Sequence, residues 1–190
     1  MKNIYFVRHG ESLANVKGVF SGQKDDLYLT LKGEQQAIDV ARKLISDFVE
    51  IDFIIYSPLK RTTQTTNIIA ERIGLSLSRV QKDERITEYD MGELTGTPIR
   101  SIPSLEFVYS HGAEDPFKFY DRVLGFFKEL QFYYKNQNVL IVSHAGVGKM
   151  LEIIKEGKSP ELFNEVPMFE NGVIQKIDWI ENCLNSQTKR

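Results

Sequence analysis

The chain has little of what would make it a disulfide-rich, metal-thiolate or membrane protein. Its 190 residues include a single cysteine, Cys183, which excludes an internal disulfide and a thiolate metal cluster. The formal net charge is −2, so no nucleic-acid partner and no anionic membrane surface is expected. No apolar run is long enough to span a membrane, and the N-terminus lacks the apolar core of a signal peptide. These absences favour a cytoplasmic enzyme or binding domain.

The arrangement of the expected elements predicts an α/β fold. The chain is long enough for one sizeable core, and we expect a single domain over residues 1–181 with a frayed tail at 182–190. Apolar runs rich in β-branched residues predict strands at about 3–7, 53–56, 77–80, 139–142 and 173–179. Apolar residues at helical spacing predict helices at about 30–48, 57–74, 115–134 and 147–155. This alternation indicates a three-layer α/β/α domain with a mostly parallel, doubly wound sheet.

The helix starts carry recognisable capping residues. Thr30 and Ser57 are predicted N-caps, and Ser57 is followed by Pro58 at the expected first helical position. Asp115 and Pro116 repeat that arrangement before the third helix.

Histidine is scarce, and two of the three histidines occupy comparable places. His9 and His144 each follow a predicted buried strand, and the carboxyl ends of parallel strands are where ligands collect in such folds. Arg8 and Arg61 belong to the same expected edge. Permanently charged guanidinium groups match phosphate oxygens and would repel a divalent cation. The sequence therefore predicts an anion site rather than a metal site.

An imidazole group is the candidate for the chemistry at this edge, because other common catalytic motifs are absent. The chain has no G-x-S-x-G elbow and no phosphate-binding P-loop, so a histidine is the candidate nucleophile or acid–base. These residues alone do not decide between His9 and His144. Taken singly, each candidate also has an ordinary structural explanation: Arg61 as a solvated helix residue, Glu88 as a turn carboxylate and His144 as a core histidine.

Ordered motifs along the chain resemble one known family. They are "VRHGESLAN" from residue 7, "FSGQKDDLYLTLKGEQQA" from 20, "YSPLKRTTQTT" from 56, "ITEYDMGELTG" from 86 and "VLIVSHAG" from 139. Together they span roughly residues 3–178 and resemble the histidine phosphatase superfamily, also called the phosphoglycerate mutase-like family. The resemblance implies a phosphoglycerate mutase-like fold.

The resemblance also implies roles for individual residues. His9 would be the phosphorylated nucleophile, and Glu88 would be the general acid that protonates the leaving oxygen. The phosphoryl oxygens would be held by Arg8, Arg61 and His144. The other substrate-binding positions implied are Asn15, Ser21, Gly22 and Ala145, where alanine replaces the usual glycine. No metal and no other cofactor is implied.

The expected substrate is a small phosphorylated metabolite, such as a sugar phosphate, phosphoserine or a cofactor precursor. We favour a phosphatase because the segment 97–111 is short and contains Arg100 as its only basic residue besides His111. A phosphoglycerate mutase-type phosphoryl transfer is the alternative, and a catalytically inactive phospho-ligand binding domain is a third hypothesis. A homodimer is left open.

Overall fold

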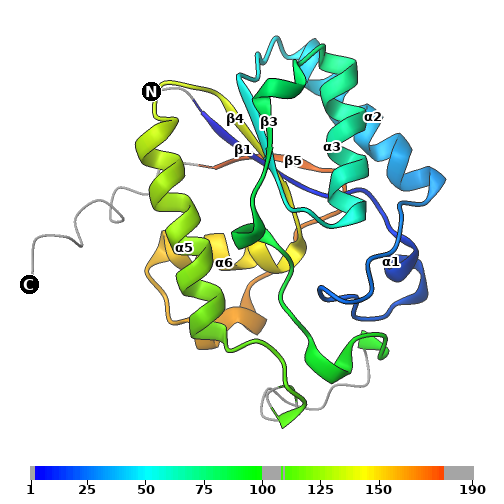
Figure 1. The fold of residues 1–190 in the computed structure, drawn as a ribbon, viewed down its shortest axis with the longest axis vertical. Helices are drawn as coiled ribbons and strands as arrows, with labels where there is room; N and C mark the ends of the chain where they lie inside the picture. Colours follow the sequence, from blue (N-terminus) through cyan, green and yellow to red (C-terminus); the bar gives the residue numbers. More distant parts are fainter. Residues whose placement is uncertain (1–2, 100–107, 109, 178–190) are drawn as a thin grey trace, which may run out of the picture.

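The fold is built on a twisted five-stranded sheet. The computed structural model describes residues 3–99, 108 and 110–177 (Figure 1). The strand order is β3-β2-β4-β1-β5. The strands are β1 (Ile4–Arg8), β2 (Phe53–Tyr56), β3 (Val80–Lys82), β4 (Val139–Ser143) and β5 (Ile174–Ile177). β1 to β4 run parallel, and β5 pairs antiparallel with β1 at the edge of the sheet.

Helices cover both faces of this sheet. They are α1 (Leu13–Lys17), α2 (Leu31–Ser46), α3 (Lys60–Ile73), α5 (Pro116–Tyr133) and α6 (Ala145–Glu156). Short 3₁₀ segments lie at Leu77–Arg79, Glu84–Ile86, Gly92–Leu94 and Pro160–Glu165. None of the helices in the described part of the chain is long and apolar enough to cross a membrane.

Alternation along the central strands separates two cores. Val139 and Ile141 of β4 belong to the core formed with α5 and α6, whereas Leu140 and Val142 belong to the core formed with α2 and α3. Successive side chains of a strand point to opposite faces, so a strand buried on both faces is apolar throughout. Figure 1 shows the two helix pairs on either side of the sheet. The predicted three-layer α/β/α architecture with a mostly parallel sheet is confirmed.

Two helix starts agree with the sequence prediction. The Thr30 hydroxyl accepts a hydrogen bond from Gly33 N at 3.0 Å, and α2 begins at the next residue. Asp115 Oδ1 accepts from Phe117 N at 2.8 Å, and Pro116 is the first residue of α5. Short polar side chains at both positions therefore cap helices as expected.

Three predicted boundaries are wrong. α3 begins at Lys60 and not after Ser57, because Ser57 Oγ is bound to His144 Nε2 at 2.7 Å. Residues Leu77–Arg79 form a 3₁₀ turn closed by Arg79 N donating to Ser76 O at 2.9 Å, and the strand starts only at Val80. The last predicted helix begins at Ala145.

Some predicted boundaries lie outside the described residues. These are the end of the strand at 173–179, the tail at 182–190 and most of the segment 97–111.

A backbone crossing joins the loop after β1 to the first turn of α2. A Cβ atom on Gly33 would lie 2.1 Å from Glu11 O, and one on Gly10 would lie 2.2 Å from Gly33 O. Thr30 N also donates to Glu11 O at 2.9 Å. The approach fixes the loop that carries His9 against a rigid helix, and it tolerates no side chain at either glycine.

Gly33→Ala should therefore destabilise the protein, although alanine is the better helix former. We expect a loss of about 1–3 kcal/mol in the free energy of unfolding, because the new methyl group must push the backbone of Glu11 away. Gly125→Ala is the matched control, since Gly125 lies within α5 and its added Cβ would contact nothing within 4 Å. That change should stabilise by about 0.5–1 kcal/mol. Urea denaturation of both variants measures the difference, and similar effects of the two changes would contradict this account.

Candidate active site

Two buried imidazoles meet at the carboxyl edge of the sheet. The ring centroids of His9 and His144 are 5.2 Å apart, although the residues come from the ends of different strands. Pairing of β1 with β4 places Arg8 opposite Ser143, and His9 N donates to Ser143 O at 2.9 Å. The parallel register of two neighbouring strands therefore brings the two histidines together.

The hydrogen bonds of His9 define its tautomer. His9 Nδ1 lies 2.7 Å from Gly10 O, and Arg61 Nε donates to His9 Nε2 at 3.2 Å. A carbonyl oxygen only accepts and a guanidinium only donates, so the proton is assigned to Nδ1 and the lone pair to Nε2. Burial, followed by the charges of Arg61 and Arg8, holds the pKa of His9 well below its usual 6.5. The arrangement presents a neutral imidazole whose Nε2 carries the lone pair and accepts a hydrogen bond from Arg61.

The two arginines have their charges enclosed by protein. Arg8 is 9% exposed and donates to Phe169 O at 2.7 Å, while Arg61 is 1% exposed and donates to Gly22 O at 2.9 Å. Burial lowers the pKa of both guanidinium groups, but each remains a cation at neutral pH. Both lie in a region of low dielectric constant, where a charge interacts strongly with a ligand of opposite sign.

Several buried polar atoms at this edge have no hydrogen-bond partner among the described residues. They are Arg8 Nε, Arg61 Nη1 and His144 Nδ1. Buried polar groups in folded proteins are almost always hydrogen-bonded, so a cluster of unsatisfied ones needs an explanation. An anion with several oxygen atoms would satisfy them together. Arg61 Nη1 has a carboxylate in the neighbourhood, since Asp26 Oδ1 is 3.6 Å away.

Glu88 is anchored through one of its two carboxylate oxygens. Glu88 Oε1 accepts from Tyr89 N at 2.9 Å and from Gly146 N at 3.0 Å, in the first turn of α6. A Cβ atom on Gly146 would lie 2.2 Å from this oxygen, so the contact requires glycine. Both bonds go to Oε1, so Oε2 is the carboxylate oxygen that these contacts leave unengaged.

The remaining predicted residues line the loops around this edge. Asn15 Oδ1 accepts from Ser12 N at 2.9 Å and from Asn171 Nδ2 at 3.3 Å, so its amide nitrogen is the group left for a substrate. Gly22 holds Arg61 through its carbonyl, and the carbonyl of Ser21 accepts from Asp25 N at 3.0 Å. Ala145 opens α6.

Sequence reasoning missed several residues that support the site. Asn171 Nδ2 donates to His9 O at 2.8 Å across 162 positions of sequence, and Gly10 N donates to Thr65 Oγ1 at 3.1 Å. Asp26 Oδ1 accepts from Lys60 N at 2.7 Å and thus caps α3 in place of Ser57. No local pattern indicates these contacts.

Lys149 is a missed residue of another kind. It lies on α6, it is 9% exposed, and its Nζ is 4.6 Å from the centroid of the Phe163 ring. Burial lowers the pKa of its ammonium group, and the nearby charge of Glu88 opposes that effect. A lysine within an otherwise apolar helix face was the available signal in the sequence.

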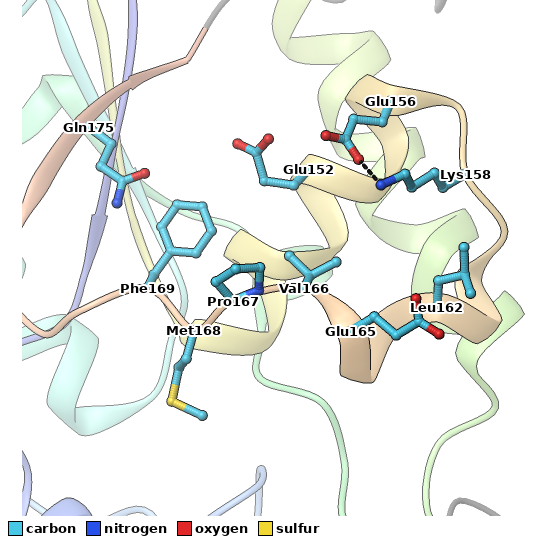
Figure 2. Close-up of a pocket in the computed structure, with 10 residues that line it drawn as sticks. All are labelled: Glu152, Glu156, Lys158, Leu162, Glu165, Val166, Pro167, Met168, Phe169 and Gln175. Carbon is cyan, nitrogen blue, oxygen red and sulfur yellow. Dashed lines mark ion pairs between the residues drawn. The ribbon is translucent and has the colours of Figure 1, made fainter.

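The described residues hold no cluster of metal ligands, and the hollow beside Phe169 does not suit an anion. None of their His, Cys, Asp and Glu side chains form a group of three or more that could hold a metal ion. A hollow of about 420 Å³ is lined by residues of α6, by the segment 162–169 that contains Phe169, and by Gln175 (Figure 2). Its walls carry Glu152, Glu156 and Glu165, and Lys158 there is paired with Glu156 at 2.6 Å. These carboxylates would repel a phosphate, in contrast to the buried arginines at the histidine edge.

Comparisons with known proteins agree with this geometry. Over 106 residues the chain is 41% identical to a probable phosphoglycerate mutase GpmB of Salmonella choleraesuis (strain SC-B67), covering 56% of this chain and 46% of that protein. The chain thus spans about half the length of the curated relatives it matches. Its structure resembles the alpha-ribazole phosphatase of Shigella flexneri, with 28% identity, a TM-score of 0.77 and coverage of 93% of this chain and 90% of that one.

A mycobacterial glucosyl-3-phosphoglycerate phosphatase in complex with VO₃ shares the fold. Its TM-score is 0.79 at 22% identity, with coverage of 94% of this chain and 93% of that one. The model of the histidine phosphatase superfamily (branch 1) matches residues 4–188. The chain therefore belongs to branch 1 of the histidine phosphatase superfamily.

Proposed function

We propose that this protein is a phosphomonoesterase that works through a phosphohistidine on His9. The observation that carries the proposal is the Nε2 lone pair of His9, which faces the buried Arg61 guanidinium at 3.2 Å. A neutral nucleophile between fixed cations is suited to attack a dianionic phosphate. The membership of the family supports the same chemistry.

The reaction follows from the positions of the side chains. His9 Nε2 forms a bond to phosphorus while the bond from phosphorus to the ester oxygen breaks, and Glu88 Oε2 gives its proton to that oxygen. Arg8, Arg61 and His144 hold the equatorial oxygens, where negative charge is spread in the transition state, and Asn15 helps to position them. Glu88 then takes a proton from water, which attacks the phosphohistidine. Inorganic phosphate leaves and neutral His9 is restored.

A small phosphorylated metabolite is the proposed substrate. The solved structures named above are described as phosphatases of such compounds, and this supports hydrolysis. A binding domain without activity would have no need of an anchored carboxylate beside its cations, so Glu88 argues against that alternative. The cytoplasmic location stays a prediction from the sequence, and a homodimer stays open.

A phosphoglycerate mutase activity is the second candidate, and two observations favour it. The curated relatives carry that name, and Lys149 adds a buried cation close to Glu88, where a second anionic group of a substrate would be attracted. Incubation with 3-phosphoglycerate distinguishes the two activities. Release of inorganic phosphate supports the phosphatase, whereas formation of 2-phosphoglycerate without phosphate release supports the mutase.

The covalent intermediate gives the direct test. A screen of phosphorylated metabolites for phosphate release would supply a substrate, and a ³²P-labelled sample quenched in alkaline detergent should leave label on the protein that acid removes. His9→Ala should abolish the label and the turnover. His111→Ala, which changes the third histidine of the chain, is the control and should label like the wild type. Equal labelling of His9→Ala would show that the nucleophile is another residue.

Glu88→Gln should separate proton transfer from binding. The amide keeps the shape of the carboxyl group but supplies no proton, so turnover of alkyl phosphates should fall about 100- to 10,000-fold. p-Nitrophenyl phosphate should lose much less, because its leaving oxygen needs little protonation. Glu84→Gln changes an exposed carboxylate a short way along the same segment and should leave both rates unchanged. Equal losses for the two ester types in Glu88→Gln would refute the general-acid role.

The acid limb of the pH profile should lie well below pH 6.5. Protonation of His9 removes the attacking lone pair, and burial with two adjacent cations lowers the pKa of this residue. Arg61→Gln removes one of those cations, so the pKa of His9 should rise and the acid limb of kcat/KM should move to higher pH. Arg42→Gln removes an exposed charge on α2 and should not move the limb. An acid limb near pH 6.5 in the wild type would contradict the assignment.

A further inference from the structure

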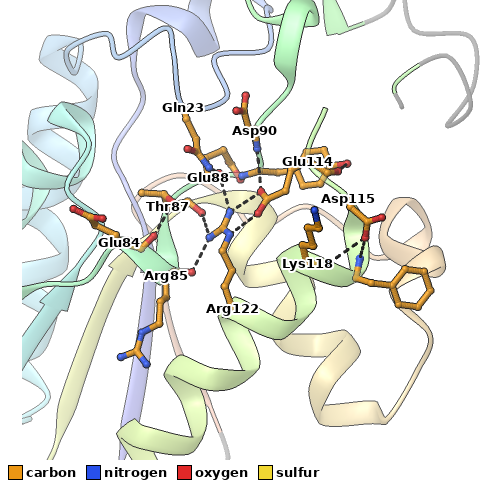
Figure 3. Close-up of polar contacts among 12 residues, drawn as sticks. Gln23, Glu84, Arg85, Thr87, Glu88, Asp90, Glu114, Asp115, Lys118 and Arg122 are labelled. Atoms are coloured by element: carbon orange, nitrogen blue, oxygen red, sulfur yellow. Dashed lines mark hydrogen bonds and ion pairs between the residues drawn. The ribbon is translucent and has the colours of Figure 1, made fainter. Parts of the chain in front are cut away.

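Arg122 on α5 joins the backbone on which Glu88 is carried. Its Nη1 donates to Arg85 O at 2.7 Å and to Thr87 O at 2.8 Å, and its Nη2 donates to Glu88 O at 3.1 Å. Figure 3 shows the guanidinium group at the centre of this turn of backbone. One planar group thus replaces the ordinary hydrogen bonds that these carbonyls would make in a helix or a strand.

The other edge of the same guanidinium group is held by Glu114. Arg122 Nε lies 2.7 Å from Glu114 Oε1, and Arg122 Nη2 lies 2.8 Å from Glu114 Oε2. Glu114 Oε2 also accepts from Asp90 N at 3.3 Å, and the Tyr89 hydroxyl donates to the Glu114 carbonyl. The pair therefore grips the backbone before Glu88 through Arg122 and the backbone after it through Glu114 (Figure 3).

The pair is rigid because it is packed as well as hydrogen-bonded. The Arg122 and Glu114 side chains are 18% and 16% exposed, and the Arg122 guanidinium carbon lies 4.4 Å from the centroid of the Phe119 ring. A two-pronged contact between a guanidinium and a carboxylate fixes orientation as well as distance. Lysine has one point charge and cannot reproduce this geometry.

We propose that Arg122 is a positioning residue that sets the place of the Glu88 carboxylate for proton transfer. The inference rests on the proposed function of Glu88. Four hydrogen bonds hold the Glu88 residue. Its main-chain oxygen accepts from Arg122 Nη2 at 3.1 Å and from Gln23 Nε2 at 2.9 Å, and Oε1 accepts from Tyr89 N and Gly146 N. General-acid catalysis requires the donor within hydrogen-bond reach of the leaving oxygen, and small displacements cost rate steeply. The hydrogen bonds of Arg122 go to Glu114 and to the backbone of residues 85, 87 and 88, and its charge contributes only the smallest of the effects that lower the pKa of His144.

Positioning predicts a pattern of rates that a purely structural role does not. Arg122→Met keeps the length of the side chain and removes every donor. Its kcat for alkyl phosphates should fall about 10- to 100-fold, whereas kcat for p-nitrophenyl phosphate should change less than about threefold, because only the first ester depends on the acid. The inhibition constant of inorganic phosphate should stay unchanged. The kcat values of Arg122→Lys for both esters should lie close to those of Arg122→Met.

Arg85→Met is the matched control. The Arg85 side chain is also an arginine paired with carboxylates, Asp83 at 2.7 Å and Glu129 of α5 at 2.8 Å, but it donates no hydrogen bond to the Glu88 backbone in the described structure. Arg85→Met should leave the ratio of the two rates unchanged. A second variant, Glu114→Gln, keeps the carbonyl contacts of Arg122 and weakens the contacts of the Glu114 carboxylate with Arg122 and Asp90 N. It should show the same pattern to a smaller extent, which keeps the test open if Arg122→Met folds poorly.

A double variant completes the test. When Glu88 is already Gln, Arg122→Met should cause less than about a twofold further loss on alkyl phosphates, since the two changes act through one group. Multiplicative losses in the double variant, or equal losses for both esters in Arg122→Met and Glu114→Gln, would overturn the positioning role. The result is separate from the proposed function: if the wild type hydrolyses neither ester, the function fails, whereas an active wild type with equal losses refutes only the role of Arg122.

Discussion

The contact between the Arg61 guanidinium and the His9 lone pair imposes the central constraint on this molecule. A cation placed 3.2 Å from an imidazole nitrogen forbids a proton there, so His9 stays neutral and its other nitrogen must carry the hydrogen. The Gly10 carbonyl receives that hydrogen at 2.7 Å. Burying such a cation costs several kcal/mol unless other groups compensate, and the surrounding structure supplies them.

The compensation comes from backbone oxygens and remote carboxylates rather than from one ion pair. Gly22 gives a carbonyl to Arg61, Phe169 gives one to Arg8, and the charges of Glu88 and Asp26 counter the effect of burial on Arg61. Because these groups neutralise the charges of Arg8 and Arg61 only in part, the site keeps a positive electrostatic potential that attracts an anion. A complete salt bridge at Arg61 would give more stability at rest and less affinity for phosphate.

The sequence predicts correctly those features that depend on neighbouring residues or on a recognisable motif. The three layers follow from periodicity, and Thr30 and Asp115 follow from the preference of helix N-termini for short polar side chains. The residues expected at the site, His9, Arg61 and Glu88, do converge. The roles given to these residues stay predictions, because no contact with a substrate tests them.

The failures of prediction have physical causes. Ser57 precedes a proline and resembles an N-cap, yet its hydroxyl binds His144 at 2.7 Å, because a long-range partner competed with the local one. The apolar residue Leu77 is part of the strand predicted at 77–80. It is 79% exposed, so its side chain does not pack against the sheet. Asp26 and Asn171 act across large separations in sequence, and no window of neighbouring residues contains both ends of such contacts.

The position of β5 in the sequence affects the order in which residues that contact one another are synthesised. The segment that enters this edge strand supplies Phe169 and Asn171, which hold Arg8 and His9 across 161 and 162 positions of sequence. During synthesis, Arg8 and His9 therefore leave the ribosome more than 160 residues before Phe169 and Asn171, respectively. Closing so long a loop is slow, and until it closes Arg8 and His9 lack the groups that orient them. The geometry around Arg8 and His9 is therefore completed only after Asn171 has been synthesised.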